Sequence, residues 1–192
     1  MNASNPLQGL RRPGSVGLPL EGVQIRARTD SGHISKVEEP GEIEVKGQNV
    51  FAGYWNREEY RSREFTEDGF FRTGDLGRID SEGYLFLIGR KKDLIISGGL
   101  NVFPKELELV IDSFTEVKES AVIGLPHPDF GEQVVAVIVA EETSRLDKPM
   151  LINKMKNKIA SFKIPKEVYF FDELPRNTMG KVQKNILRKK LS

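Results

Sequence analysis

The stretch Val134-Val135-Ala136-Val137-Ile138-Val139 decides the fold of the second half of this chain. A short run of apolar and mostly β-branched residues predicts a buried strand. Around it we expect strands and helices in the order β-α-β-β-α-β, which indicates an α+β domain. Its other elements would be a strand at 94–97, a helix that begins at Pro104, a strand at 120–123, a helix from about Pro149 and a strand at 168–171. We expect the inward faces of the two helices at Leu107, Val110, Ile111 and Phe114, and at Leu151, Ile152, Met155 and Ile159.

The preceding part of the chain predicts a different unit, made of short strands and glycine-containing turns. Val23–Ala27 and Gly41–Gly47 alternate apolar and polar side chains, as half-buried strands do. Residues 80–88 indicate a hairpin, and Glu58–Phe65 a short helical piece. We therefore expect a small antiparallel, β-barrel-like subdomain here, and a domain boundary that gives 1–91 and 92–192.

Composition limits the function classes. The chain has 29 Lys and Arg against 28 Asp and Glu, a net charge of +1 that does not favour nucleic-acid binding. It has no cysteine and two histidines, so we expect no metal site built from thiolates or imidazoles. No apolar run approaches the roughly 20 residues that span a bilayer. We expect a cytoplasmic protein with no membrane span.

The tail carries a candidate catalytic cation. Lys181 follows a glycine in the polar loop Leu174–Val182, for which we expect little intrinsic structure. An ammonium on a long stem can neutralise a phosphate and a carboxylate together, although a solvated surface lysine has the same local sequence. The cations that cluster here indicate a short terminal helix with either a solvated face or an attraction for an anionic ligand: Lys181, Lys184, Arg188, Lys189 and Lys190.

Four motifs occur in one order along the chain. They are Gly53-Tyr54-Trp55-Asn56, Phe71-Arg72-Thr73-Gly74-Asp75-Leu76-Gly77, Gly89-Arg90-Lys91-Lys92-Asp93 with Ser97-Gly98-Gly99, and Pro175-Arg176-Asn177-Thr178-Met179-Gly180-Lys181. Together they resemble the C-terminal part of the acyl-CoA synthetases in the adenylate-forming superfamily, and the resemblance covers essentially the whole chain. Within the family, Pro126–Glu132 and the tail through Asn185 are most similar to malonyl-CoA synthetases.

The resemblance implies an acid–thiol ligase that works in two steps. ATP and a carboxylic acid give an acyl-adenylate and pyrophosphate, and coenzyme A then gives the thioester and AMP. The cofactors implied are ATP/AMP, CoA and Mg²⁺, with the Mg²⁺ ligands outside this chain. Residues 1–91 would be the final β subdomain of the large domain, and 92–192 the mobile C-terminal domain.

The same resemblance assigns roles at the nucleotide. Asp75 would hold the ribose hydroxyls, Arg90 would contact the nucleotide, and Arg72 would support them nearby. Lys181 would reach the acyl carboxylate and the α-phosphate during adenylation. Taken alone, Asp75 is also compatible with an ordinary turn aspartate.

Lys92 occupies the hinge position of the family, about which the C-terminal domain would rotate between the two steps. After rotation, the loop Ser97-Gly98-Gly99 would line the approach of the CoA thiol. The residue patterns alone leave other interpretations open, since Gly89–Asp93 also fits a charged turn and the two glycines a tight strand-to-helix connection.

The family's phosphate-binding loop, its Tyr-Gly-x-Thr-Glu element and its acid pocket do not occur in these residues. We therefore expect a fragment that lacks its N-terminal domain and is inactive alone, with malonate as the favoured acid. Two alternatives remain: a non-catalytic binding module with the same fold, and a fragment of another adenylate-forming enzyme.

Overall fold

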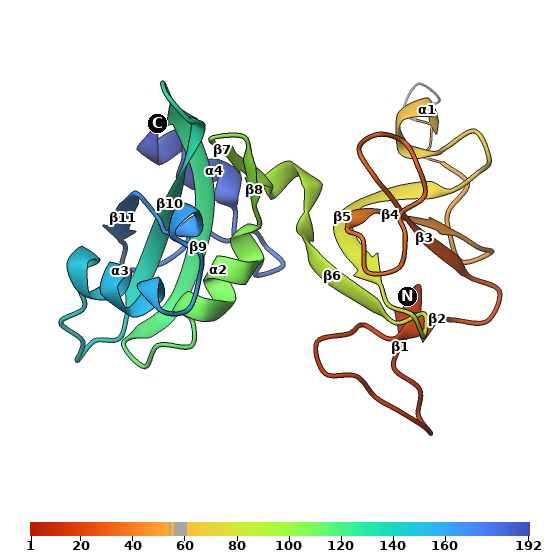
Figure 1. Cartoon of the computed structure of the whole chain (residues 1–192), viewed down its shortest axis with the longest axis horizontal. Helices are drawn as coiled ribbons and strands as arrows, with labels where there is room; N and C mark the ends of the chain where they lie inside the picture. The colour runs from red at the N-terminus through yellow and green to blue at the C-terminus, as the bar shows by residue number, and fades with distance from the viewer. Residues whose placement is uncertain (54, 56–60) are drawn as a thin grey trace. The chain divides into compact units, whose positions relative to one another are not determined.

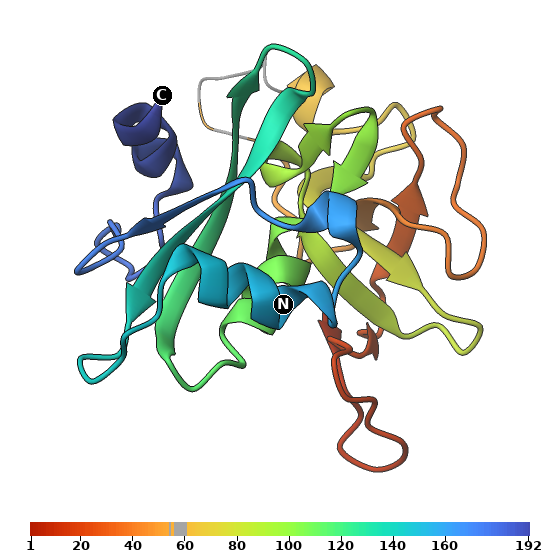
Figure 2. The ribbon, with the colours of Figure 1, turned by 60° about the vertical axis from the view of Figure 1, so that its left-hand side comes forward.

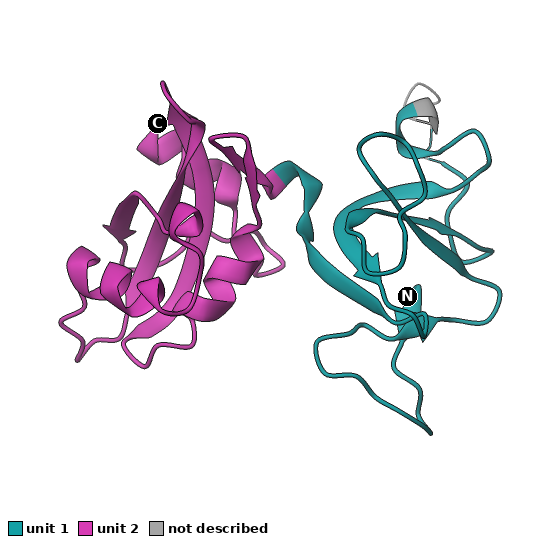
Figure 3. Ribbon diagram, in the orientation of Figure 1, with its two compact units in different colours: residues 1–92 teal, residues 93–192 magenta. Residues whose placement is uncertain are grey.

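The computed structural model describes residues 1–53, 55 and 61–192. The chain folds into two compact units, Met1–Lys92 and Asp93–Ser192 (Figure 3). The boundary expected from the sequence, after residue 91, differs by one residue. The motif Gly53–Asn56 and the expected helical piece from Glu58 lie partly outside the described residues.

The first unit is built on an antiparallel sheet of four strands in sequential order, β3-β4-β5-β6 (Figure 1). The strands are β3 (Gln24–Arg28), β4 (Gly41–Lys46), β5 (Phe71–Ile79) and β6 (Leu85–Arg90). A two-stranded ribbon of β1 (Ala3–Ser4) and β2 (Leu18–Pro19), and the short helix α1 (Arg61–Glu64), complete the described elements. Ala27, Ile43, Val45 and Leu85 form the buried core of this sheet.

The antiparallel strands expected for this unit are confirmed, and they form an open sheet rather than a closed barrel. Within the part of the chain that the structure describes, β3 and β6 are edge strands of an open sheet and do not pair with each other. Four twisted strands form too narrow a sheet for its edges to meet, since even small closed barrels have more strands. Strand β5 was not expected as a strand, because Gly74, Asp75 and Gly77 interrupt its apolar alternation.

The second unit confirms the α+β class and adds one strand to the expected order. Strand β10 pairs with β9 in an antiparallel hairpin and with β11 in parallel, and the short hairpin β7–β8 joins the same sheet through β10. Helices α2 and α3 begin at Pro104 and Lys148, close to the expected positions. The elements are β7 (Ile95–Ser97), β8 (Leu100–Val102), α2 (Pro104–Ile111), β9 (Val117–His127), β10 (Gly131–Ala140), α3 (Lys148–Lys156), β11 (Glu167–Phe170) and α4 (Lys184–Leu191).

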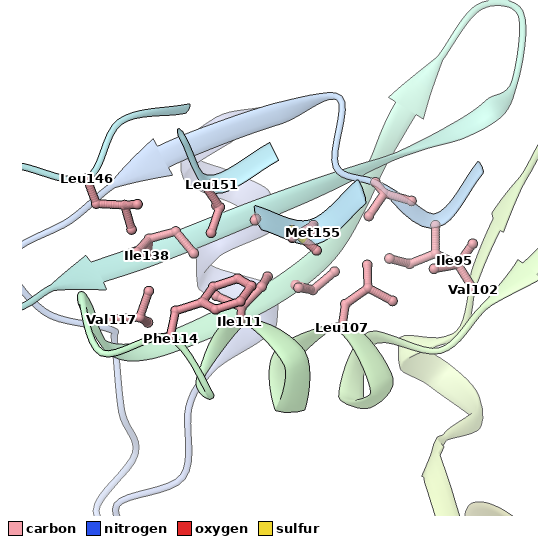
Figure 4. Packing of buried hydrophobic residues seen from close by; sticks show 13 residues of the cluster. Ile95, Val102, Leu107, Ile111, Phe114, Val117, Ile138, Leu146, Leu151 and Met155 are labelled. Atoms are coloured by element: carbon pink, nitrogen blue, oxygen red, sulfur yellow. The ribbon is translucent and has the colours of Figure 1, made fainter. Parts of the chain in front are cut away.

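The run 134–139 is apolar throughout because both faces of β10 are covered. Val134, Ala136 and Ile138 lie in one buried cluster with residues of α2 and α3, among them Leu107, Ile111, Leu151 and Met155 (Figure 4). The alternate residues, Val135, Val137 and Val139, lie in a second cluster with Leu187 of α4. Figure 2 shows the helices on the two faces of this sheet. The layered packing makes the β9–β10 hairpin a rigid support for the loops at its ends.

Among the described residues, no helix is both long enough and apolar enough to cross a membrane.

Candidate functional site

Strands β5 and β6 bring Asp75 and Arg90 together. The two residues are directly opposite each other in the antiparallel register. Arg90 Nε makes an ion pair with Asp75 Oδ1 at 2.9 Å, and Arg90 Nη1 donates to the carbonyl of Thr73 at 2.8 Å. Gly74, between these two acceptors, has a φ of 69°, which a residue with a Cβ rarely adopts. The local backbone therefore aims both acceptors at one guanidinium.

Thr73 also belongs to this corner, although its sequence pattern predicted no role for it. Its hydroxyl donates to the carbonyl of Ile43 at 2.8 Å and accepts from the amide of Asp75 at 3.0 Å. These bonds tie β5 to β4 where the ladder between them shifts register. In the sequence, only the position of Thr73 in the Thr-Gly-Asp motif indicated that it lies beside Asp75.

The electrostatics of the corner suit a polar, anionic ligand. Partial burial raises the pKa of the Asp75 carboxyl above its ordinary value, against the opposing effects of the Arg90 charge and the Thr73 hydroxyl. Beside it lies an open hollow of about 400 Å³, lined by Glu42, Thr73, Gly74, Arg90, Lys91 and Lys92. Of the three cations in this lining, Arg90 is paired with Asp75, and Lys91 with Glu42 and Asp30. Lys92 has no ion pair with a described residue, so its charge can attract a negatively charged group.

The structure does not bring Arg72 to this corner. Its Nη1 donates to the carbonyls of Arg63 and Phe65, at 2.9 and 3.1 Å. It lines a different hollow of about 1200 Å³, together with Phe51 and Phe65. Arg72 and Asp75 are three residues apart on β5, an odd separation that places their side chains on opposite faces of a regular strand. The supporting role expected for Arg72 stays a prediction.

Lys92 lies between two residues that are each attached to their own unit. Lys91 Nζ contacts Glu42 at 2.9 Å and Asp30 at 3.2 Å, and the hydrogen bond to Glu42 raises the pKa of the Lys91 ammonium. Asp93 accepts from Arg188 Nη2 at 3.1 Å, inside the second unit. The Lys92 side chain is exposed and makes no ion pair with any residue that the structure describes.

The glycine pair forms a hairpin turn between β7 and β8, so the alternative of a tight strand-to-helix connection does not hold. Gly98 and Gly99 have φ values of 57° and 77°. Two consecutive positive φ angles in a two-residue loop are typical of a type I′ turn, whose twist matches that of the flanking strands. The amide of Gly98 donates to the carbonyl of Phe130 at 2.9 Å, so the turn lies against the tip of the β9–β10 hairpin.

The loop that carries Lys181 is ordered, which corrects the expectation of little intrinsic structure. Asn177 Oδ1 accepts from the amides of Met179 at 3.0 Å and Lys181 at 2.9 Å. The backbone of Asn177 also pairs with Lys181 and Gly180 at 2.9 Å each, and Arg176 forms a bridge with Val182. The segment is a closed turn from which the exposed Lys181 side chain projects.

The Lys181 loop and the glycine turn lie toward opposite ends of the β9–β10 hairpin. Arg176, at the base of the loop, makes an ion pair with Glu119 near the start of β9. The glycine turn contacts the other end of the hairpin, where His127 pairs with Gly131. From Glu119 to His127 the strand runs about 25 Å, at a rise of about 3.3 Å per residue.

Two cations of the basic tail form ion pairs within the second unit. Lys184 Nζ contacts Glu108 Oε1 at 2.6 Å, and Arg188 is held by Asp93. The buried Glu108 also accepts from the amide of Val122 at 2.9 Å, so it links α2, β9 and α4. The expected terminal helix is confirmed as α4, and its cations serve in part to hold it.

The described residues contain no group of three or more His, Cys, Asp or Glu side chains placed to hold a metal ion.

Known proteins resemble this chain in sequence and in structure. Residues 106–181 match the AMP-binding enzyme C-terminal domain. The chain is 43% identical to an indoleacetate–CoA ligase of Aromatoleum aromaticum over 95% of its length, and 40% identical to a malonate–CoA ligase of Arabidopsis thaliana over all of it. It spans 36% and 33% of these two relatives, about a third of their length.

Among solved structures, ATP-bound MatB from Rhodopseudomonas palustris superposes with a TM-score of 0.94 and 52% identity. The superposition covers 99% of this chain and 38% of that one. The chain is therefore a relative of the CoA ligases, and it corresponds to the C-terminal part of an adenylate-forming enzyme.

Proposed function

We propose that this chain is the C-terminal part of an ATP-dependent acid–CoA ligase. In the first step a carboxylate oxygen bonds to the α-phosphorus of ATP, the bond from that phosphorus to the bridging oxygen breaks, and pyrophosphate leaves. In the second step the sulfur of CoA bonds to the acyl carbon, its proton is lost, and AMP leaves. A carboxylate is a poor electrophile, so the phosphate leaving group is what makes the second step feasible.

The Asp75–Arg90 corner is proposed to hold the nucleotide. A carboxylate can accept hydrogen bonds from both hydroxyls of a ribose, and Arg90 already keeps Asp75 oriented at 2.9 Å. Lys91 and Lys92 add positive charge to the adjoining hollow, which suits a phosphate-bearing ligand.

Lys181 is proposed to act in adenylation. Both reactants of that step are anionic, so a cation placed between the carboxylate and the α-phosphate stabilises the charge that they share in the transition state. Its ammonium projects from an ordered turn, which keeps the cost of positioning low.

One observation carries the proposal: the Lys181 loop and the Gly98–Gly99 turn lie toward opposite ends of one rigid hairpin. When the second unit places the Lys181 end of the hairpin at the reacting groups for adenylation, the Gly98–Gly99 end cannot lie there at the same time. Rotation about Lys92 would exchange the ends, with Ser97 and the two glycines beside the CoA thiol in the second step. Glycines there let the backbone approach a ligand closely.

Malonate is the acid that we propose. The 52% identity to MatB and the 40% identity to a malonate–CoA ligase support it, while the 43% identity to an indoleacetate–CoA ligase favours a different acid. The acid pocket is proposed to lie in the remainder of the ligase, so this chain supports the choice only through its relatives.

A substrate panel tests the proposal. The complete ligase, given ATP, CoA and one acid at a time, should release AMP and pyrophosphate fastest with malonate. Faster turnover with an aryl acetate or a fatty acid would show that malonate is not the preferred acid, while the proposal of an acid–CoA ligase would stand. The isolated 192-residue chain should catalyse no ATP–pyrophosphate exchange with any of these acids, because it has a nucleotide corner without a triphosphate site. A complete protein that activates none of them would refute the proposed function.

A further inference from the structure

The turn that carries Lys181 is joined to β9 by the side chain of Arg176, while Leu174 and Val182 at the base of the loop pack in the buried cluster of β9 and β10. Its Nη1 donates to the carbonyl of Gly180, next to Lys181, at 2.6 Å. Its Nη2 makes an ion pair with Glu119, which is 57 residues away in sequence, on β9. The guanidinium thus bridges the tip of the loop and the rigid hairpin.

The geometry of arginine suits this double contact. Its planar fork holds two acceptors in a fixed relation, which the point charge of a lysine cannot do. Asn177 closes the turn internally through the amides of Met179 and Lys181, and it makes no contact with β9 among the contacts that the structure describes. Asn177 therefore sets the shape of the turn, and Arg176 joins its tip to β9.

We propose that Arg176 and Glu119 are positioning residues for Lys181, so that the lysine enters the first reaction from a loop fixed in advance to β9. The inference deepens the proposed function and rests on the role of Lys181 in adenylation. Loss of the ion pair does not change the charge of Lys181, but the loop that carries the lysine then adopts many positions. Adenylation should therefore fall, while the second step, which uses the other end of the hairpin, should not.

The test combines amide hydrogen exchange of the 192-residue chain, followed by NMR, with half-reactions of the complete ligase. The variants are Glu119→Gln, which keeps the shape of the side chain, and Arg176→Lys, which keeps its charge. Lys118→Gln is the matched control, because Lys118 is the exposed neighbour on β9 and has no ion pair with a described residue. Thermal unfolding of each variant confirms that it is folded.

We expect both variants to accelerate exchange at Gly180 and Lys181 by roughly threefold to tenfold, the range for losing a half-exposed charge-assisted contact. ATP–pyrophosphate exchange should fall by a similar factor, with thioester formation from synthetic acyl-adenylate unchanged. The control should match the parent protein in all three measurements.

Two results would overturn the inference while leaving the proposed function standing. One is unchanged amide exchange at Gly180 and Lys181 in both variants, which would show that the ion pair does not order the loop. The other is faster exchange with normal adenylation, in a ligase in which Lys181→Ala does slow adenylation. If Lys181→Ala itself has no effect on adenylation, the proposed role of the lysine fails, and the positioning role fails with it.

Discussion

Asp75 shows how its surroundings alter the ionisation of a single residue. The family motifs assigned Asp75 and Arg90 to one nucleotide without predicting that they pair, and the register of β5 and β6 places the two side chains 2.9 Å apart. The sequence could not predict that Arg72 turns away, since a β5 strand interrupted by glycines has no clear alternation. Nor could it predict the part of Thr73, whose bonds depend on the register shift between β4 and β5.

The raised pKa of Asp75 leads to a prediction on stability. In the folded chain Asp75 binds a proton more readily than in the unfolded chain. Protonation of Asp75 therefore stabilises the fold. This stabilisation is fully present below the pKa of the unfolded chain and is lost as pH rises through the pKa of the folded chain. The free energy of unfolding of the parent chain, relative to Asp75→Asn, should therefore increase as pH falls toward the ordinary aspartate value of 3.8. Urea unfolding of both proteins at a series of pH values measures this difference. A difference that shrinks as pH falls would contradict the assigned shift.

At the scale of elements, the second unit follows the apolar patterns of the sequence closely. Helices α2 and α3 bury Leu107, Ile111, Leu151 and Met155 as expected, because tertiary packing and helical periodicity agree there. Strand β8 was missed because it is three residues long and largely exposed. The bonds that order the Lys181 loop are local, made by Asn177, and were missed in the sequence, whereas its anchor on β9, Glu119, is remote in sequence.

The glycine turn permits a prediction at this scale. Gly99→Ala places a Cβ at a φ of 77°, so it should destabilise the 192-residue chain by about 1 kcal/mol, the cost of a left-handed conformation. Gly99→Asn is the matched control and should cost less, because asparagine tolerates this conformation better than alanine does. Chemical denaturation of the three proteins tests the prediction. Equal losses in both variants would show that the backbone conformation is not what demands glycine here.

For the whole molecule, the contacts on either side of Lys92 narrow the proposed hinge to one residue. Lys91 is bound to Glu42 and Asp30 in the first unit, and Asp93 to Arg188 in the second. Each contact must break before the flanking residue can take part in a rotation, whereas the Lys92 side chain has no ion pair to break among the described residues. The motif order predicted the hinge position, but the two anchors come from residues scattered along the chain.

Lys92→Pro should separate the two half-reactions in the complete ligase. The pyrrolidine ring fixes φ, so it should hold one orientation, preserving ATP–pyrophosphate exchange and suppressing thioester formation by at least about tenfold. Lys92→Ala keeps the backbone free and should retain both activities. Normal overall turnover in the proline variant would rule out Lys92 as the pivot.

The central claim is that Lys181 supplies positive charge to the first reaction and takes no part in the second. The most direct measurement compares the two half-reactions of the complete ligase with and without the Lys181→Ala substitution. We expect the variant to lose adenylation, by about a hundredfold or more, and to convert preformed acyl-adenylate to thioester at the parent rate. Equal losses in both half-reactions, or undiminished adenylation, would contradict the account.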